Sequence, residues 1–199
     1  ASKTGHPILR PMLFEFPADE NTYELTEQFM LGGDLLIAPV LQKGEREKRV
    51  YFPEGKWIDW HDLHEYEGTG FQEVSAPLER LPLFARKRSI VPLAPEGNFV
   101  DENTEPITLL VFDPEESSST LYDEEEVVVS SKKEDNSIVF RMSPTNKSFV
   151  VRFLKLEGKE TVGENAEIIE TSQDGDWFDI AFTTSGKEVI IRISRRSNI

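Results

Sequence analysis

Short apolar runs separated by Pro, Gly, Asp and Asn follow one another along the chain. Several runs alternate, so that Phe149, Val151 and Phe153 fall on one face of an extended strand and the residues between them on the other. This pattern is typical of all-β proteins. We predict strands over residues 8–16, 34–40, 49–52, 57–60, 71–75, 83–86, 89–93, 107–112, 119–122, 127–130, 137–142, 148–156, 167–170, 177–183 and 188–194.

The run over residues 8–16 begins so early that nothing before it can cover a buried strand. We therefore expect the start of this chain to be the interior of something larger. Pro11 interrupts the run and requires a bulge or a sheet edge. Helix signals are sparse, and the best candidate is one turn over residues 26–31.

The stretch from Ala94 to Glu105 is rich in Pro, Gly, Asn and Glu, which marks a domain boundary. A chain of 199 residues, 38% hydrophobic and with thirteen Phe, can build one large or two small cores. The regular spacing of the predicted strands favours antiparallel sandwiches on both sides of the boundary.

Acidic residues exceed basic ones by 37 to 22, which gives a net charge of −15. This charge argues against nucleic acid and anionic membranes as partners, because both require clustered Lys and Arg. We otherwise attribute the negative net charge to its ordinary role of keeping a protein soluble. The absence of cysteine excludes disulfides and thiolate chemistry, and with the absence of a signal-peptide pattern it favours a cytoplasmic location.

Two histidines, His61 and His64, stand three apart with Asp59, Asp62 and Glu65 around them. On a helix this spacing could present two ligands to a metal ion. The segment lies between a Trp-rich strand and a Gly turn, however, so we expect an exposed polar loop and no metal site.

The remaining candidates for chemistry are weaker. His6 precedes Pro7 near the chain start and is expected to be solvated. The densest carboxylates, Asp123 to Glu126, could suggest a glycosidase pair, which needs two carboxyl groups about 5–5.5 Å apart in retaining enzymes. Neighbouring residues on a strand point to opposite faces, so we expect a solvated acidic loop.

Trp57 and Trp60 could form a stacking platform for sugar rings or could pack in the core. Three residues apart on a strand, they point to opposite faces, so at most one of them faces solvent. We favour core packing.

Four ordered segments resemble glycoside hydrolase family 31, the family of α-glucosidases and α-xylosidases. Residues 5–17 read Gly-x-Pro-x-x-Arg-Pro-x-x-x-x-Phe-Pro, and residues 28–40 read Gln-Phe-x-x-Gly-x-x-Leu-Leu-x-x-Pro-Val. Residues 51–59 resemble the family's Tyr-x-Pro-x-Gly-x-Trp-x-Asp segment. Residues 76–92 resemble its Ala-Pro-Leu to Ile-x-Pro run, with Lys87-Arg88 in place of a small residue and Gly.

Further along, Leu121-Tyr122-Asp123-Glu124 resembles a Leu-Tyr-x-Asp-Asp-Gly segment of the family's last domain, without its Gly. The resemblance implies an all-β chain with two antiparallel β-sandwich domains in tandem, preceded by a short remnant of the last strand of a (β/α)8 barrel. The implied boundaries are 1–22 for the barrel fragment, 23–100 for the proximal sandwich and 101–199 for the distal sandwich.

Members of the family cleave α-glycosidic bonds with retention, using two Asp residues on barrel strands. No residue of this sequence matches those motifs, so we assign no catalytic, cofactor-binding or metal-binding residue. The resemblance implies no cofactor, and as partners the missing barrel and an α-glucoside carbohydrate. Two alternatives stay open: a free-standing carbohydrate-binding module, and a structural piece that docks to a separately made barrel chain.

Overall fold

A computed structural model describes residues 5–94, 106–122, 126–157 and 160–194. Their regular secondary structure is almost entirely β-strand, which confirms the all-β prediction. The chain divides into two compact units, Ala1–Lys87 (unit 1) and Arg88–Ile199 (unit 2). Each unit is described by itself.

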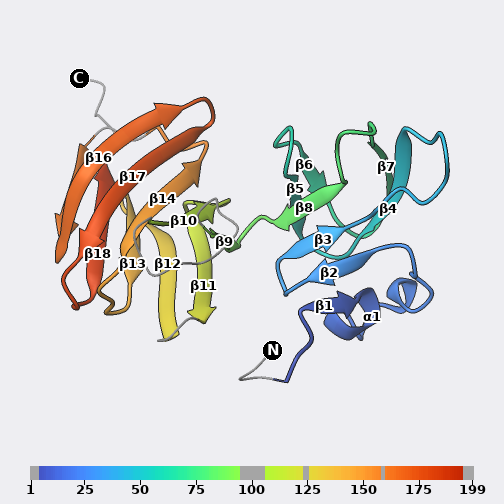
Figure 1. Cartoon of the computed structure of the whole chain (residues 1–199), viewed down its shortest axis with the longest axis horizontal. Coiled ribbons are helices and arrows are strands. Elements are labelled where there is room, and N and C mark those ends of the chain that lie inside the picture. The colour runs from blue at the N-terminus through green and yellow to red at the C-terminus, as the bar shows by residue number, and fades with distance from the viewer. Residues whose placement is uncertain (1–4, 95–105, 123–125, 158–159, 195–199) are drawn as a thin grey trace. The chain divides into compact units, whose positions relative to one another are not determined.

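Unit 1 packs a six-stranded sheet, in the order β1-β2-β3-β8-β5-β6, against the β4–β7 pair (Figure 1). The strands of the large sheet are β1 (Leu9–Pro11), β2 (Phe29–Leu31), β3 (Leu35–Ile37), β5 (Lys56–Asp59), β6 (Glu65–Glu67) and β8 (Leu83–Arg86). The pair is formed by β4 (Glu47–Phe52) and β7 (Gly70–Ser75). Side chains from both layers, such as Leu36, Phe52 and Phe84, are fully buried between them.

The N-terminal run does not form one buried strand, which corrects the prediction for residues 8–16. It gives β1 and then the short helix α1 (Met12–Glu15), with Pro11 as the residue before the helix. The break falls at Pro11 because proline lacks a backbone N–H for a ladder yet suits the start of a helix. Met12 is fully buried, whereas Ile8 is 63% exposed and Leu9 58% exposed.

The turn of helix predicted over residues 26–31 is also wrong, since this segment contains β2. β2 pairs with β1 on one side and with β3 on the other, through three residue pairs each, and this pairing outweighs the local helix preference. Gly32, at φ +63°, provides the turn between β2 and β3. The only other helix of the described residues is the 3-10 turn η1 (Glu20–Thr22).

Unit 2 is a sandwich of two five-stranded sheets with a common core, and Figure 1 shows the sheets stacked face to face. Phe140 and Ile191 from one sheet meet Phe149 and Ile180 from the other. One pair, β10 with β14, is parallel, whereas the prediction was antiparallel throughout. The first sheet contains β9 (Ile90–Leu93), β10 (Ile107–Val111), β14 (Ser148–Leu154), β16 (Ala166–Asp174) and β17 (Trp177–Thr184). The second contains β11 (Glu116–Tyr122), β12 (Glu126–Glu134), β13 (Ser137–Met142), β15 (Glu160–Glu164) and β18 (Val189–Ser194).

β6 and β15 are strands that the sequence pattern did not reveal, because both are mostly polar. β9 pairs with β10 and so belongs to the sheet of unit 2. The predicted boundaries at residues 22 and 100 stay predictions. The division between the two compact units falls between Lys87 and Arg88, thirteen residues before the second of these boundaries.

Candidate functional site

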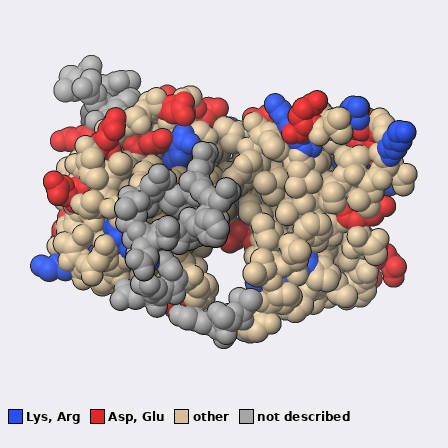
Figure 2. All heavy atoms as spheres, in the orientation of Figure 1, with Lys and Arg blue, Asp and Glu red and all other residues tan. Residues whose placement is uncertain are grey.

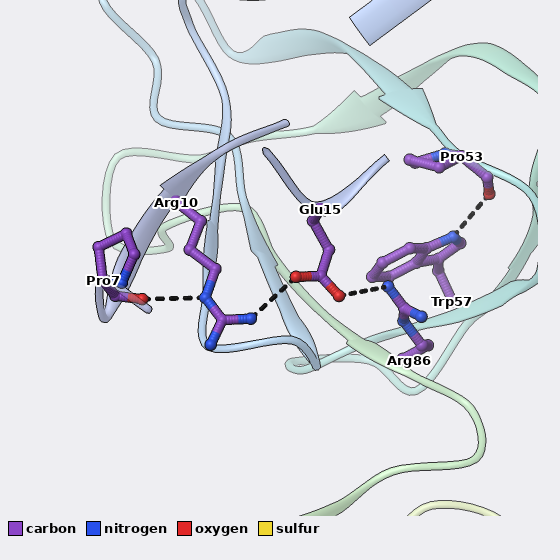
Figure 3. Close-up of polar contacts among 6 residues, drawn as sticks. All are labelled: Pro7, Arg10, Glu15, Pro53, Trp57 and Arg86. Atoms are coloured by element: carbon purple, nitrogen blue, oxygen red, sulfur yellow. Dashed lines mark hydrogen bonds and ion pairs between the residues drawn. The ribbon is translucent and has the colours of Figure 1, made fainter. Parts of the chain in front are cut away.

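A cluster of charged side chains ties the N-terminal segment to the large sheet of unit 1 (Figure 3). Arg10 donates from Nη1 to Oε2 of Glu15 at 2.8 Å and from Nε to the carbonyl of Pro7 at 2.9 Å. The other oxygen of Glu15 lies 3.7 Å from Nη2 of Arg86, at the end of β8. Glu15 thus joins two arginines that are far apart in the sequence.

Aromatic rings cover the Arg86 guanidinium. Its central carbon lies 5.1 Å from the centre of the Phe16 ring and 5.4 Å from that of Trp57. Trp57 is fully buried, and its indole N–H donates to the carbonyl of Pro53 at 2.9 Å. Core packing of Trp57 is therefore confirmed, and Trp60 is half-buried.

Asp34 lies in the β2–β3 turn beside the same cluster. Burial raises the pKa of its carboxyl, and the nearby negative charge of Glu15 adds to the rise, while the positive charges of Arg86 and Arg10 oppose it. The cluster thus contains two acids and two bases at the edge of the core. Opposite charges held in this way fix the position of the segment from Pro7 to Glu15.

Gln28 forms a second anchor, and the sequence did not single it out by its chemistry. Its amide nitrogen donates to the carbonyl of Tyr51 at 2.8 Å, and its oxygen accepts from the N–H of Tyr51 at 2.9 Å. The buried side chain thus replaces a strand in pairing with β4. The Tyr51 hydroxyl donates to Asp19 at 2.6 Å, and this bond lowers the pKa of the Asp19 carboxyl.

The segment from His61 to His64 is a loop, as predicted, and Glu65 begins β6. Oδ1 of Asp59 accepts from the backbone N–H of His61 at 2.7 Å, so Asp59 shapes the turn. His61 Nε2 lies 2.9 Å from the carbonyl oxygen of Leu81. Glu65 accepts from Lys56 and Lys87 at 2.8 and 2.7 Å, and these bonds lower its pKa. In the part of the chain that the structure describes, no group of three His, Asp or Glu side chains is placed to hold a metal ion.

The other candidates stay apart from these clusters. His6 is exposed, and its ring meets that of Phe14 edge-on at 5.3 Å. Asp123, Glu124 and Glu125 lie outside the described residues, and Glu126 is exposed at the start of β12. Figure 2 shows acidic side chains spread over the visible face, with basic ones among them.

Apolar side chains are exposed on β1, α1 and the segment before them. They are Ile8, Leu9, Leu13 and Phe14, with exposed fractions from 42% to 63%. Beside them is an apolar hollow of about 450 Å³, lined by residues of β1, α1 and the segment 22–29. The sequence predicted burial for this run, and the structure places much of it at the surface of unit 1.

No helix among the described residues is long and apolar enough to cross a membrane. This finding concerns helices alone.

Comparisons with known proteins match the segment that carries these clusters. Residues 5–91 match the sequence profile of the glycosyl hydrolase family 31 C-terminal domain. Alpha-glucosidase 2 of Bacillus thermoamyloliquefaciens is 41% identical over 93 residues, which are 47% of this chain and 12% of that protein. The alpha-xylosidase of Saccharolobus solfataricus is 34% identical over 110 residues, 54% of this chain and 15% of that protein.

The similarity to solved structures extends over both units. The dextranase of Flavobacterium johnsoniae, a family 31 protein solved with glucose, has a TM-score of 0.87 and 26% identity. The match covers 96% of this chain and 29% of that one. The cycloalternan-forming enzyme of Listeria monocytogenes shares the fold, with a TM-score of 0.84 and 21% identity. The chain thus spans less than a third of each of these proteins.

Proposed function

Residues 5–91 belong to the C-terminal domain of glycosyl hydrolase family 31, and from this premise we propose that the chain is the non-catalytic C-terminal part of a retaining α-glycosidase. In the intact protein, unit 1 supports the catalytic barrel. The substrate of the intact protein is an α-glucoside, the class of compound that gives the α-glucosidase relatives their name.

The observation that carries this proposal is the exposed apolar surface of β1 and α1. Isolated exposed apolar residues are normal, but adjacent ones beside an apolar hollow mark an interaction site. Among the described residues of unit 1, β1 is the edge strand of its sheet and pairs with β2. Its outer edge can therefore accept another strand. A barrel that places its own strand and helices here would cover both.

The charged cluster supports the same role. Arg10 and Glu15 precede and follow the break at Pro11. Arg10 pairs with Glu15, and Glu15 in turn lies against Arg86 of the large sheet. A barrel strand that continues into this segment would therefore be fixed in position by the sandwich. This arrangement suits a support for the catalytic domain.

Activity measurement provides the first test. The purified chain is expected not to hydrolyse p-nitrophenyl α-glucoside, because it lacks matches to both catalytic Asp motifs. Turnover above that of a heat-denatured sample would refute the proposal. The alternative of a free-standing sugar-binding module predicts sugar binding without association with a barrel, so calorimetry with maltose and isomaltose distinguishes it only together with the complementation below.

Complementation provides the second test. The Bacillus alpha-glucosidase 2, truncated before its matching segment, is expected to be recovered as a soluble complex when co-expressed with this chain. The double substitution Leu9→Asp and Leu13→Asp should abolish the complex, whereas Leu78→Asp, at a residue 79% exposed elsewhere on unit 1, should not. Equal recovery with both variants would contradict docking through β1 and α1.

A further inference from the structure

A second hollow in unit 1 lies directly after α1. It has a volume of about 650 Å³ and is lined by residues 15–21 together with Tyr51, Glu54 and Thr69. This volume is within the range of small-molecule sites, roughly 300–1,000 Å³. The hollow is separate in its lining from the apolar hollow beside β1.

The lining selects the class of ligand. It contains the carboxylates of Glu15, Asp19, Glu20 and Glu54 and no lysine or arginine. Glu15 is paired with Arg10 and Arg86, and the other three carboxylates disfavour an anion. Among the described residues, these carboxylates form no group of three that could hold a metal ion. A neutral ligand that donates hydrogen bonds from several hydroxyl groups suits these acceptors best.

Some of the polar groups are held in place and others are available. Asn21 donates from its amide nitrogen to Asp19 at 3.0 Å and to the Tyr51 hydroxyl at 3.2 Å, which leaves its oxygen as an acceptor. The side chains of Glu54 and Thr69 make no hydrogen bond or ion pair with other described residues. The site therefore combines an amide held in place, that of Asn21, with two side chains, Glu54 and Thr69, whose polar atoms are available to a ligand.

An exposed aromatic ring, that of Phe71, lies against Tyr51, which lines the hollow. Phe71 is the cross-strand partner of Tyr51, and their ring centres are 5.1 Å apart. The guanidinium of Arg49 lies 4.2 Å from the centre of the Phe71 ring, and Phe71 is still 44% exposed. A ring that is held on one side and exposed elsewhere can stack against the apolar C–H face of a sugar.

We propose that this hollow and Phe71 bind a neutral sugar, one or two glucosyl units of an α-glucan. The choice of ligand rests on the proposed function, whereas the location rests on the residues above.

Titration of the whole 199-residue chain tests the proposal. Isomaltotriose and maltotriose are added to the ¹⁵N-labelled chain, and amide chemical shifts are followed by NMR. We expect saturable, millimolar binding, with shift changes confined to residues 15–21, 51–54 and 69–71. No saturable shifts with either sugar, or shifts centred elsewhere, would overturn the proposal.

Variants link the binding to the named side chains. Phe71→Ala and Glu54→Gln should each weaken binding at least fivefold without changing the thermal unfolding of the chain. The matched controls Tyr122→Ala, at an aromatic residue 57% exposed in unit 2, and Glu79→Gln, at an exposed glutamate, should bind as the wild type does. Wild-type affinity in folded Phe71→Ala would refute the site.

The outcomes also separate this site from the proposed function. Loss of sugar binding with an intact complementation result would remove the site alone. Binding with failed complementation would support the site and count against barrel support.

Discussion

The pairing of Gln28 with β4 gives the sharpest test of how unit 1 is held together. The substitution Gln28→Glu keeps the shape of the side chain and exchanges its NH₂ donor for an oxygen. The new oxygen can still accept from the N–H of Tyr51, but when ionised it cannot donate to the Tyr51 carbonyl, 2.8 Å from the present nitrogen. The buried Tyr51 carbonyl, which now accepts from the Gln28 amide, would then lie against the introduced carboxylate.

The size of the effect follows from these contacts. A buried polar group left without a partner costs about 1–3 kcal/mol, and more when the group is charged. Gln28 is only 5% exposed, so solvent screens little of this cost. We expect unit 1 to lose roughly 2–4 kcal/mol of unfolding free energy at neutral pH.

The loss should depend on pH with a defined sign. Burial and the Tyr51 carbonyl both oppose ionisation of the introduced carboxyl, so its pKa in the folded state exceeds the ordinary value of about 4.3. Below that ordinary value the carboxyl is protonated in both states, and its O–H can donate to the carbonyl. The loss of stability should therefore be smallest below about pH 4.3 and grow as the pH rises through the higher, folded-state pKa.

Denaturation followed by tryptophan fluorescence measures this difference. Trp57 and Trp60 lie in unit 1, and replacing the one tryptophan of unit 2, Trp177→Phe, confines the signal to unit 1. The control Gln72→Glu changes a half-buried Gln whose amide donates to the Glu67 carbonyl at 2.7 Å in an exposed hydrogen bond, and should change stability by less than about 0.5 kcal/mol. A loss for Gln28→Glu that is equal at pH 4 and pH 7, or no larger than that of the control, would refute the reasoning.

Three further predictions follow from single contacts. Asp34→Asn should stabilise unit 1 at neutral pH, because burial raises the pKa of this carboxyl. The gain should vanish as the pH falls below the ordinary pKa of Asp. A melting-temperature difference that does not depend on pH would contradict this. Tyr51→Phe should return the lowered pKa of Asp19 toward its ordinary value, as read from the carboxyl ¹³C shift in a pH titration; an unchanged titration would exclude the hydroxyl as the cause. Gly186→Ala should destabilise unit 2 by about 1 kcal/mol or more, because Gly186 has φ +71° and a Cβ there would lie 2.7 Å from Oδ1 of Asn146. Calorimetry that shows unchanged unfolding of unit 2 would count against this prediction.

The motif positions acquire physical roles in the structure. Gln28, Asp59 and Arg86 belong to the segments that resemble the family, and each makes a contact that holds unit 1 together. Local pattern alone did not indicate the roles of Gln28 and Arg86, because their partners Tyr51 and Glu15 are distant in the sequence. Only the likeness of the motifs indicated them, without saying what they do.

The sequence by itself determined the strand content, because alternation of apolar and polar residues reports which side chains a sheet can bury. It determined most strand positions in unit 2, where Phe149, Val151 and Phe153 turn inward as their alternation predicts. Ordered motifs in the first half of the chain also indicated the family whose C-terminal domain residues 5–91 match.

Tertiary structure decided what propensity could not. Residues 29–31 form a strand because two neighbouring strands pair with them, although their own preference allows a helical turn. The apolar run over residues 8–16 is divided at Pro11, and its exposure depends on what packs against it. Pairing, burial and the joining of Arg10, Glu15 and Arg86 arise from contacts between distant residues, and such contacts are fixed only when the whole of unit 1 has folded.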